Sequence, residues 1–514
     1  MAGIIINIIL TITTFVLIMI FHLHMFQLNS YKVKEEFTWI GRKRHEIIGR
    51  ILFLIPAVIG MIVNVKFINW IALLFVILTA FINKPKKAKI SLKYTKRVQR
   101  LILTISIIFT IGMVLTYIQK DYLYFQALLY VMMIFMPYLV IIANWINKPI
   151  EKGISNYYIN DARKVISSMD NLITIGITGS YGKTSMKYIL NEILSTKFNV
   201  LMTPGNYNTT LGVTKTIRES LRPIHQVFIC EMGARNVGDI EEIAKLVCPK
   251  YGIITSIGEQ HLESFKSIDN IIKTKFELID NLTGDGIAIL NYENGFIKNR
   301  EVGCKFVSYG FGDNVDFMPS DISITTEGSS FIMKETDGSE VRFKTPLIGT
   351  HNVLNIAGAI AVASILGVRL ESMKKSVKRL KAVPHRLELV KNGDITIIDD
   401  AYNSNPSGAK KALETLNMLE GYRIVITPGM VELGQKEEEL NRIFGMQIAE
   451  VADYVVLVGE KQTRPIYDGI CSRDFDMDNI YIASSFEKAM EKVRGIKTDK
   501  AKVALLENDL PDNY

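Results

Sequence analysis

The sequence holds few of the residues that would point to a disulfide-linked, metal-bound or fibrous protein. Its 514 residues include only 4 Cys, 14 Pro and 35 Gly. The cysteines are widely spaced and form no C-x-x-C pair, so we expect neither disulfides nor a cysteine metal site, and a reducing cytoplasm suits them. Low Gly and Pro contents, together with 48% hydrophobic residues, exclude a collagen-like, low-complexity or wholly disordered chain.

Acidic residues are scarce in the first 150 positions, which hold 4 Asp and Glu against 17 Lys and Arg. The other 364 residues hold 48 acidic and 43 basic side chains, so the net charge of +8 joins a strongly basic part to a mildly acidic one. Because the basic part is also the most apolar, it is typical of membrane helices with cytoplasmic basic loops. We therefore expect contact with membrane lipids and no nucleic-acid partner.

Apolar runs before residue 147 predict an α-helical membrane region with about five spans. The second and third runs are short and nearly contiguous, which predicts a helical hairpin. No A-x-A-like site follows the first run, and this argues against a cleaved signal peptide. Buried helices of a soluble domain are the alternative, but five in succession favour the membrane. The runs are Ile4–Phe21, Ile47–Val63, Phe67–Ile82, Leu101–Ile118 and Tyr122–Ile146.

Basic loops between these runs predict the orientation. Lys84–Arg100 contains eight basic residues and no acid, and Tyr31–Glu46 contains five basic residues. Such loops lie in the cytoplasm, so we expect a multi-pass protein of the cell membrane whose part after about residue 147 is cytoplasmic. For Lys84–Arg100 we expect contact with anionic headgroups, and a lipid-linked phosphate substrate or a plain solvated face are the alternatives. Residues 148–170 are expected to form a connector helix.

A glycine-rich turn between a predicted strand and a predicted helix marks a phosphate site. The strand Leu172–Gly176 runs into GITGSYGKTS, and an apolar 3–4 spacing from Met186 to Leu194 follows. Backbone N–H groups of such a turn and the helix N-terminus surround an anion. The spacing is GxxGK[ST] rather than the strict P-loop, because Ile177 stands where the first Gly is expected. The residues predicted to bind nucleotide here are Gly179, Ser180, Gly182, Lys183, Thr184 and Ser185.

Three further segments supply polar side chains near the same predicted sheet. Glu231 follows the strand Gln226–Cys230, and His261 follows the strand Tyr251–Ser256. Ligands bind at the carboxyl ends of parallel strands, so Glu231 is placed to hold Mg²⁺. Lys275 stands in KTKFELI, where we expect a helix to begin.

The order of these motifs resembles that of the Mur ligase family, and most closely its MurF type, which adds D-alanyl-D-alanine to a UDP-muramoyl tripeptide. The resemblance covers about residues 171–514. It implies an α/β P-loop ATPase-like central domain at 171–383 and a Rossmann-like α/β C-terminal domain at 384–514, after the membrane region at 1–147. The matching segments read TGSYGKTS, TPGNYNTTLGV, CEMGARNVGDI, IGEQHLESF, TKFELI, GTHNVLNIAGAIA, VPHRLELV, DDAYNSNPSGA and MVELG.

The resemblance also implies roles for single residues. Lys183 and Thr184 would bind the phosphates of ATP and a magnesium ion. Glu231 and His261 would hold magnesium. Lys275 would become a carbamate, an anion that can coordinate metal where an ammonium cannot. These residues form the implied catalytic and metal set: Lys183, Lys275 and His261 for catalysis, and Thr184, Glu231, His261 and Lys275 for the metal.

Other implied roles compete with simpler interpretations. Asn352 and Asn355 would reach the adenine side, although Asn352 also fits a helix N-cap. Arg386 and Asp400 would be contributed to ATP by the C-terminal domain, with a hinge near Ala382–His385, although Asp400 also fits a turn cap. Asn206 and Asn208 would face the acyl substrate or form a tight loop. For Tyr402 and Glu432 no role is assigned.

The pattern around these motifs predicts the remaining architecture. Alternating strands and helices after residue 384 include the strands Ile395–Asp399, Arg423–Pro428 and Tyr454–Val458, which indicates a Rossmann-like domain. The segment Cys304–Thr345 alternates apolar and polar residues between glycines, which indicates antiparallel strands within the central domain.

The resemblance implies an ATP-dependent amide ligase that acts through an acyl phosphate. Its expected partners are ATP, a carboxylate-bearing envelope precursor and an amino-acid or dipeptide amine. Soluble Mur ligases carry a UDP-sugar-binding domain where this chain has apolar runs, so a lipid-linked acyl substrate becomes an option. A membrane-tied poly-γ-glutamate-type synthetase is one alternative, and a non-catalytic nucleotide-binding membrane protein is another.

Overall fold

The computed structural model divides into a helical unit, Met1–Asn156 with Pro511–Tyr514, and an α/β unit, Tyr157–Leu510. It describes residues 2–52, 54–55, 66–82, 91–118, 122–260, 262–325, 327–334, 338–401, 405–431 and 433–508. His261, Tyr402 and Glu432 therefore lie outside the described residues. So do 56–65, where the turn of the expected hairpin falls, and 83–90, which hold four of the eight basic residues of the expected basic loop.

The helical unit contains two helices long and apolar enough to cross a membrane, within the residues described: Ile9–Leu28 and Lys96–Val114. A bent pair raises the number to three. This supports a membrane region of two or three spans, and the five-span topology and its orientation stay predictions. The helices of this unit are α1 (Ala2–Leu28), α2 (Val33–Arg42), α3 (Arg44–Ile51), α5 (Lys66–Ile82), α6 (Lys96–Ile118), α7 (Tyr122–Ile134) and α8 (Met136–Ser167).

The exposed surface of α6 is apolar. Leu103, Ile107 and Ile111 recur every four residues and are each at least half exposed, while Leu101 and Ile105 are buried against neighbouring helices. A soluble protein rarely exposes such a continuous apolar face, so this pattern supports contact with lipid.

The last apolar run is not one straight helix, contrary to expectation. It forms α7 and then α8, which are bent by 81° at Phe135. Pro137 explains the break, because proline lacks an N–H and its ring clashes with the carbonyl four residues earlier. From there α8 continues without interruption to Ser167, past Pro149.

Part of the basic segment Lys84–Arg100 binds within the helical unit rather than facing outward. Arg100 Nε lies 2.7 Å from Glu151 Oε1, and Arg97 donates to Asn144 Oδ1 at 3.0 Å. The Arg97 guanidinium also lies 4.0 Å from the centre of the Tyr31 ring. These two arginines tie α6 to α8, so fewer of the eight positive charges face the headgroups than the sequence suggests.

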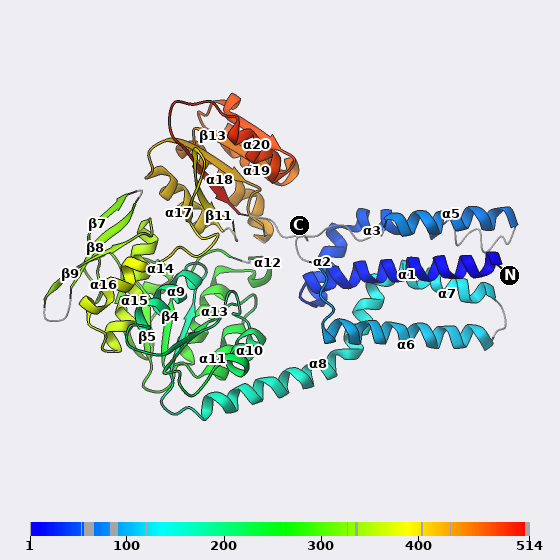
Figure 1. Cartoon of the computed structure of the whole chain (residues 1–514), viewed down its shortest axis with the longest axis horizontal. Coiled ribbons are helices and arrows are strands. Elements are labelled where there is room, and N and C mark those ends of the chain that lie inside the picture. Colours follow the sequence, from blue (N-terminus) through cyan, green and yellow to red (C-terminus); the bar gives the residue numbers. More distant parts are fainter. Residues whose placement is uncertain are drawn as a thin grey trace. The chain divides into compact units, whose positions relative to one another are not determined.

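The central domain is a doubly wound parallel sheet with helices on both faces (Figure 1). Its strand order is β2-β3-β1-β4-β5-β6. The chain leaves β1 towards β2 on one side and leaves β3 towards β4 on the other, so β1 and β3 flank the switch point where such folds bind ligands. The strands are β1 (Ile173–Thr178), β2 (Val200–Met202), β3 (Val227–Glu231), β4 (Tyr251–Ile254), β5 (Ile287–Asn291) and β6 (Lys305–Tyr309).

Two layers of helices cover this sheet. One face is covered by α9 and α15, which together bury an apolar core, and the other by α10, α11 and α13. Apolar residues spaced three and four apart account for α9, since Met186, Ile189, Leu190, Ile193 and Leu194 are all buried as expected. The helices are α9 (Lys183–Leu194), α10 (Thr210–Ser220), α11 (Asp239–Val247), α12 (Leu262–Phe265), α13 (Ile268–Asp280), α14 (Gly295–Lys298), α15 (Thr350–Ile365) and α16 (Leu370–Arg379).

The segment Cys304–Thr345 is antiparallel only in part, which corrects the expectation. Its first strand, β6, pairs parallel with β5 and extends the main sheet. The rest forms a separate antiparallel sheet of β7 (Ser320–Thr325), β8 (Gly328–Lys334) and β9 (Glu340–Thr345). Apolar and polar residues alternate clearly in β7 and β9 but not in β6. The expectation was wrong for β6 because it extended the pattern of these two strands to the whole segment.

The C-terminal domain is a mixed sheet ordered β10-β11-β15-β12-β13-β14. All neighbours are parallel except β10, which pairs antiparallel with β11 at the edge. The three expected strands are present, each within one residue of its expected bounds. The elements are β10 (Glu388–Asn392), β11 (Ile395–Asp400), α17 (Pro406–Asn417), β12 (Tyr422–Thr427), η1 (Gly434–Lys436), α18 (Glu437–Val451), β13 (Tyr454–Val458), α19 (Glu460–Cys471), η2 (Met477–Asn479), β14 (Ile480–Ala483), α20 (Phe486–Arg494) and β15 (Lys502–Glu507).

Candidate nucleotide and metal site

The glycine-rich turn connects β1 to α9 at the switch point. Gly182 is the N-cap of α9 and has a φ of 81°, a left-handed conformation that glycine adopts without steric cost. A Cβ on Gly182 would lie 3.3 Å from Oδ1 of Asn355, so the turn packs directly against α15. Asn355 therefore lies beside the phosphate loop, and its expected contact with the adenine side of the nucleotide stays a prediction.

Residues after β4 hold the turn in shape. The Ser180 hydroxyl donates to the Gly258 carbonyl at 3.0 Å, and Tyr181 N donates to Ser256 Oγ at 2.9 Å. Thr255 Oγ1 in turn donates to the Tyr181 carbonyl at 2.6 Å. Sequence reasoning missed Thr255 and Ser256, although hydroxyl side chains directly after a buried strand were an available signal.

Lys183 lies in the first turn of α9 and folds back over the phosphate loop. Its ammonium donates to the carbonyls of Gly179 at 2.5 Å and Ser180 at 3.3 Å. Burial lowers the pKa of Lys183 to about 8, with the Glu231 carboxylate opposing that shift and the Arg386 guanidinium adding to it. Lys183 of the central domain and Arg386 of the C-terminal domain are therefore close enough to interact electrostatically.

Glu231 ends β3 and is buried beside the phosphate loop. Its Oε1 accepts hydrogen bonds from Thr184 Oγ1 at 3.2 Å and from Asn208 Nδ2 at 3.1 Å. A hydroxyl and a carboxylate are oxygen ligands of the kind that Mg²⁺ takes, so these side chains fit the expected metal. His261 lies outside the described residues, and among those described no group of three His, Cys, Asp or Glu side chains could hold a metal.

Asn206 and Asn208 belong to the loop between β2 and α10, and their side chains have different surroundings. Asn206 is exposed, whereas the Asn208 amide contacts Glu231. The Asn208 carbonyl also accepts from Gly233 N at 2.7 Å. The loop therefore joins the carboxylate site through one of its two asparagines.

Lys275 lies in the middle of α13, not at its start as expected. It is only 2% exposed and lies near Lys183. Burial holds the pKa of Lys275 well below its usual value of 10.5, and the neighbouring Lys183 charge adds to this, while Glu277 and Asp239 oppose it. A neutral amine, unlike an ammonium, reacts with CO₂, so the environment of Lys275 fits the expected carbamate.

Asn352 is not a helix N-cap, which corrects one interpretation. Gly349 caps α15, and Asn352 lies in its first turn with Nδ2 donating to the Ile348 carbonyl at 2.8 Å.

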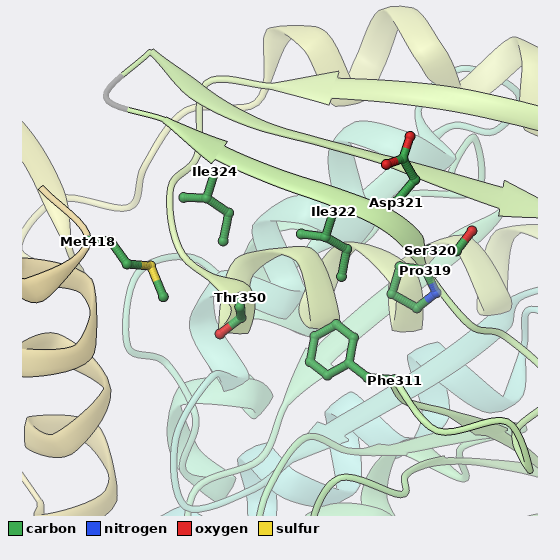
Figure 2. Close-up of a pocket in the computed structure, with 8 residues that line it drawn as sticks. All are labelled: Phe311, Pro319, Ser320, Asp321, Ile322, Ile324, Thr350 and Met418. Atoms are coloured by element: carbon green, nitrogen blue, oxygen red, sulfur yellow. The ribbon is translucent and has the colours of Figure 1, made fainter.

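Thr350 of the same turn lines a cavity of about 490 Å³ that Figure 2 shows between this helix end and the antiparallel sheet. The cavity is lined by Phe311, Pro319, Ser320, Asp321, Ile322, Ile324, Thr350 and Met418.

Arg386 and Asp400 lie together in the C-terminal domain. Burial raises the pKa of the Asp400 carboxyl to about 6, and the Arg386 guanidinium opposes that shift. The alternative role of Asp400, capping the turn before Ser404–Pro406, is not tested, because 402–404 lie outside the described residues. The next helix, α17, is capped by Asn405 through Gly408 N. Asp400 Oδ1 instead accepts from Leu387 N at 3.2 Å, directly after Arg386.

The central and C-terminal domains touch near the phosphate loop. Lys411 of α17 lies 4.6 Å from the centre of the Tyr181 ring, and Lys436 Nζ lies 2.8 Å from Glu259 Oε1. A Cβ on Gly258 would approach Ser407 Oγ at 3.1 Å. Residues from both domains therefore surround the turn that is expected to bind phosphate.

Comparison with known proteins places this arrangement in a family. The Mur ligase middle domain matches residues 177–363, and the Mur ligase, glutamate ligase domain matches residues 385–506. The chain belongs to the Mur ligase family, whose members are ATP-dependent amide-bond ligases. Residues 1–176 lie outside both matches.

Within the family the chain resembles MurF-type proteins. It is 31% identical over 336 residues to the UDP-N-acetylmuramoyl-tripeptide–D-alanyl-D-alanine ligase of Escherichia coli, covering 62% of this chain and 72% of that one. It is 34% identical over 278 residues to the ligase of the same name from Bacillus subtilis, covering 54% of this chain. The match spans 60% of the length of the B. subtilis protein.

A solved structure shows the same likeness. The crystal structure of MurF from Acinetobacter baumannii superposes with a TM-score of 0.63 at 26% identity, covering 70% of this chain and 78% of that one. The central and C-terminal α/β domains therefore have the fold of a Mur ligase.

Proposed function

We propose that this protein is a membrane-tied, ATP-dependent amide ligase of MurF type. The observation that carries the proposal is the meeting of Thr184, Asn208 and Lys187 on the buried Glu231 carboxylate, beside a phosphate loop that Lys183 covers. A hydroxyl and a buried carboxylate beside a phosphate loop would hold the Mg²⁺ that transfer of the γ-phosphoryl group of ATP requires.

The chemistry follows from the charges that must meet. A carboxylate is a poor acyl donor, because its leaving group would be oxide. Transfer of the γ-phosphoryl group of ATP to a carboxylate oxygen gives an acyl phosphate and ADP. An amine then attacks the acyl carbon, loses a proton and expels inorganic phosphate as the amide forms.

The residues of this chain offset repulsion between the two anions. Lys183 and Arg386 provide positive charge near the phosphates, and preorganised charge of this kind stabilises a phosphoryl-transfer transition state. Thr184, Glu231 and a carbamate on Lys275 would hold Mg²⁺, which supplies electrostatic stabilisation when bound. Asn352 and Asn355 would lie on the adenine side of the nucleotide.

The acyl substrate is proposed to be a carboxylate-bearing envelope precursor, and the amine an amino acid or dipeptide. The E. coli and B. subtilis relatives are named for the transfer of D-alanyl-D-alanine, which makes that dipeptide the first amine to test. The apolar helices of the N-terminal unit would keep the site near the membrane surface, where lipid-linked precursors are found.

The test uses the full chain in detergent with ATP, Mg²⁺ and bicarbonate, and with panels of muramoyl peptides and amines. We expect phosphate release that depends on both substrates, and the product mass identifies them. Lys183→Met should abolish this release, while the exposed Lys273→Met should not. Release that is unchanged in Lys183→Met would contradict the site, and a ladder of glutamate additions would favour the polymer synthetase.

A further inference from the structure

Lys187 is a buried lysine that the nucleotide motif does not explain. It lies on α9, one turn after Lys183 and on the same stripe as Leu190 and Leu194, and its side chain has 0% exposure. Burying an ammonium is unfavourable unless it is paired. Two partners fulfil that need: Glu231 Oε2 lies 2.9 Å from Nζ, and the Gly205 carbonyl accepts from Nζ at 2.6 Å.

The two oxygens of Glu231 therefore have different surroundings. Oε2 faces Lys187, whereas Oε1 faces Thr184 and Asn208. An ion pair on Oε2 fixes the rotation of the carboxylate. As a result a single oxygen, Oε1, is directed towards the hydroxyl of the phosphate loop.

The loop between β2 and α10 is held by the same pair. Gly205 binds Lys187 through its carbonyl, and Asn208 binds Glu231 through its amide. Gly205 has a φ of 48° and no atom within 4 Å of a Cβ built on it, so no packing on that side holds it. Its carbonyl is instead bound by the ammonium of Lys187.

We propose that Lys187 is a positioning residue that holds the Glu231 carboxylate and the 203–209 loop in one fixed arrangement. It touches neither nucleotide nor substrate and acts through Glu231 and Gly205. For the metal, this inference rests on the proposed function, because it takes Glu231 as a magnesium ligand. For the loop, it rests on the two hydrogen bonds alone.

Charge compensation and positioning of Glu231 predict opposite changes in Mg²⁺ binding when Lys187 is removed. If Lys187 merely neutralised Glu231, its removal would free a negative charge and strengthen Mg²⁺ binding. If it positions Glu231, its removal lets the carboxylate rotate and weakens Mg²⁺ binding. Residues behind metal ligands typically contribute about 10-fold or more to metal affinity.

The experiment compares wild type, Lys187→Met and the control Lys273→Met as full chains in detergent. Mass spectrometry follows amide hydrogen exchange in residues 203–209 and in β1. Calorimetry measures ADP affinity with and without Mg²⁺. In Lys187→Met we expect exchange in 203–209 to be about tenfold faster with β1 unchanged, and the gain in ADP affinity from Mg²⁺ to fall about tenfold.

Either of two results overturns the proposal: unchanged exchange in 203–209, or a larger gain from Mg²⁺. If Lys187→Met fails to fold, Lys187→Met/Glu231→Gln removes the uncompensated buried charge and still lacks the donor to Gly205, so its loop must exchange faster. If wild type itself gains nothing from Mg²⁺, the proposed metal site fails, whereas the exchange result continues to test the hold of Lys187 on the loop.

Discussion

The His385 imidazole Nδ1 lies 2.8 Å from Oδ2 of Asp399, across the turn that carries Arg386. His385 and Leu387 both have positive φ values, 60° and 49°, which side-chain-bearing residues adopt at a cost. Asp400 accepts from Leu387 N on the other side of Arg386. The adjacent Asp399 and Asp400 thus stabilise a strained turn. Because they bind the residues on either side of Arg386, they set the direction of its side chain.

This relationship predicts a small, shared effect on nucleotide binding. His385→Asn keeps a residue that tolerates positive φ but loses the pair, and Asp399→Asn loses its charge. Since the imidazole is largely exposed, each should lower ADP affinity only about threefold. Calorimetry on the single and double variants checks this. The double variant should be no weaker than either single one, and additive losses would show that the two residues act separately.

Gly182 offers a test of the phosphate loop with a closely matched control. Gly182 and Gly238 are both left-handed N-caps, with φ of 81° and 92° and ψ of −11° and −13°. Alanine at either site should cost about 1 kcal/mol in backbone strain. Only Gly182 lies against Asn355, since nothing lies within 4 Å of a Cβ on Gly238.

Gly182→Ala should therefore lower ADP affinity about tenfold, as expected when one charge-assisted hydrogen bond is lost. Gly238→Ala should leave it unchanged. Equal losses in the two variants would mean that backbone strain, not the approach of Asn355, controls the loop.

Lys275→Met should separate stability from activity. The buried amine is unfavourable as a cation, so a methionine of similar volume should stabilise the protein by about 1 kcal/mol or more. Ligase activity should fall about 100-fold, because the metal loses an anionic ligand. Added bicarbonate should stimulate wild type and Lys273→Met but not this variant. Bicarbonate stimulation that persists in Lys275→Met would exclude a carbamate at Lys275.

Asp400→Asn should give a pH-dependent gain in stability. The folded-state pKa of about 6 lies above the usual 3.8, so the folded protein binds the proton more tightly and loses stability as pH rises between these values. Below both values wild type and variant should melt alike. Above about pH 6 the variant should be more stable by about 3 kcal/mol. Melting curves of both proteins across this pH range test the prediction. A difference in stability that is the same at all pH values would assign the effect to packing and not to the titration of Asp400.

The sequence predicted those parts of the site that form from short, contiguous segments. The turn at Gly179–Ser185 and the position of Glu231 at a strand end both follow from local pattern. Each of these predictions depends on a few neighbouring residues. Local sequence determines them because a strand end or a helix N-cap needs little tertiary information.

Other features depend on residues far apart in the chain. In the sequence Lys187 resembles an ordinary surface lysine of a helix, because its partner Glu231 lies in β3, far away along the chain. Its position on the apolar stripe with Leu190 was nevertheless a signal that it is buried. The grouping of β6 with the antiparallel strands failed because the alternation of β7 and β9 was extended to β6, which does not alternate and pairs parallel with β5. The apolar length of Tyr122–Ile146 concealed the break at Phe135, because hydropathy reports the apolar content of a segment and not the direction of its backbone.

The position of β15 affects the order in which the protein becomes active during synthesis. This strand, Lys502–Glu507, lies between β11 and β12 at the centre of the C-terminal sheet, although among the described residues it comes after every other strand in sequence. The central sheet and the helix α15 that covers one of its faces end at Ile365, so they can fold while translation continues. The sheet that carries Asp400 has a gap until residue 507 has left the ribosome, so the nascent chain can acquire its phosphate loop well before its complete nucleotide site.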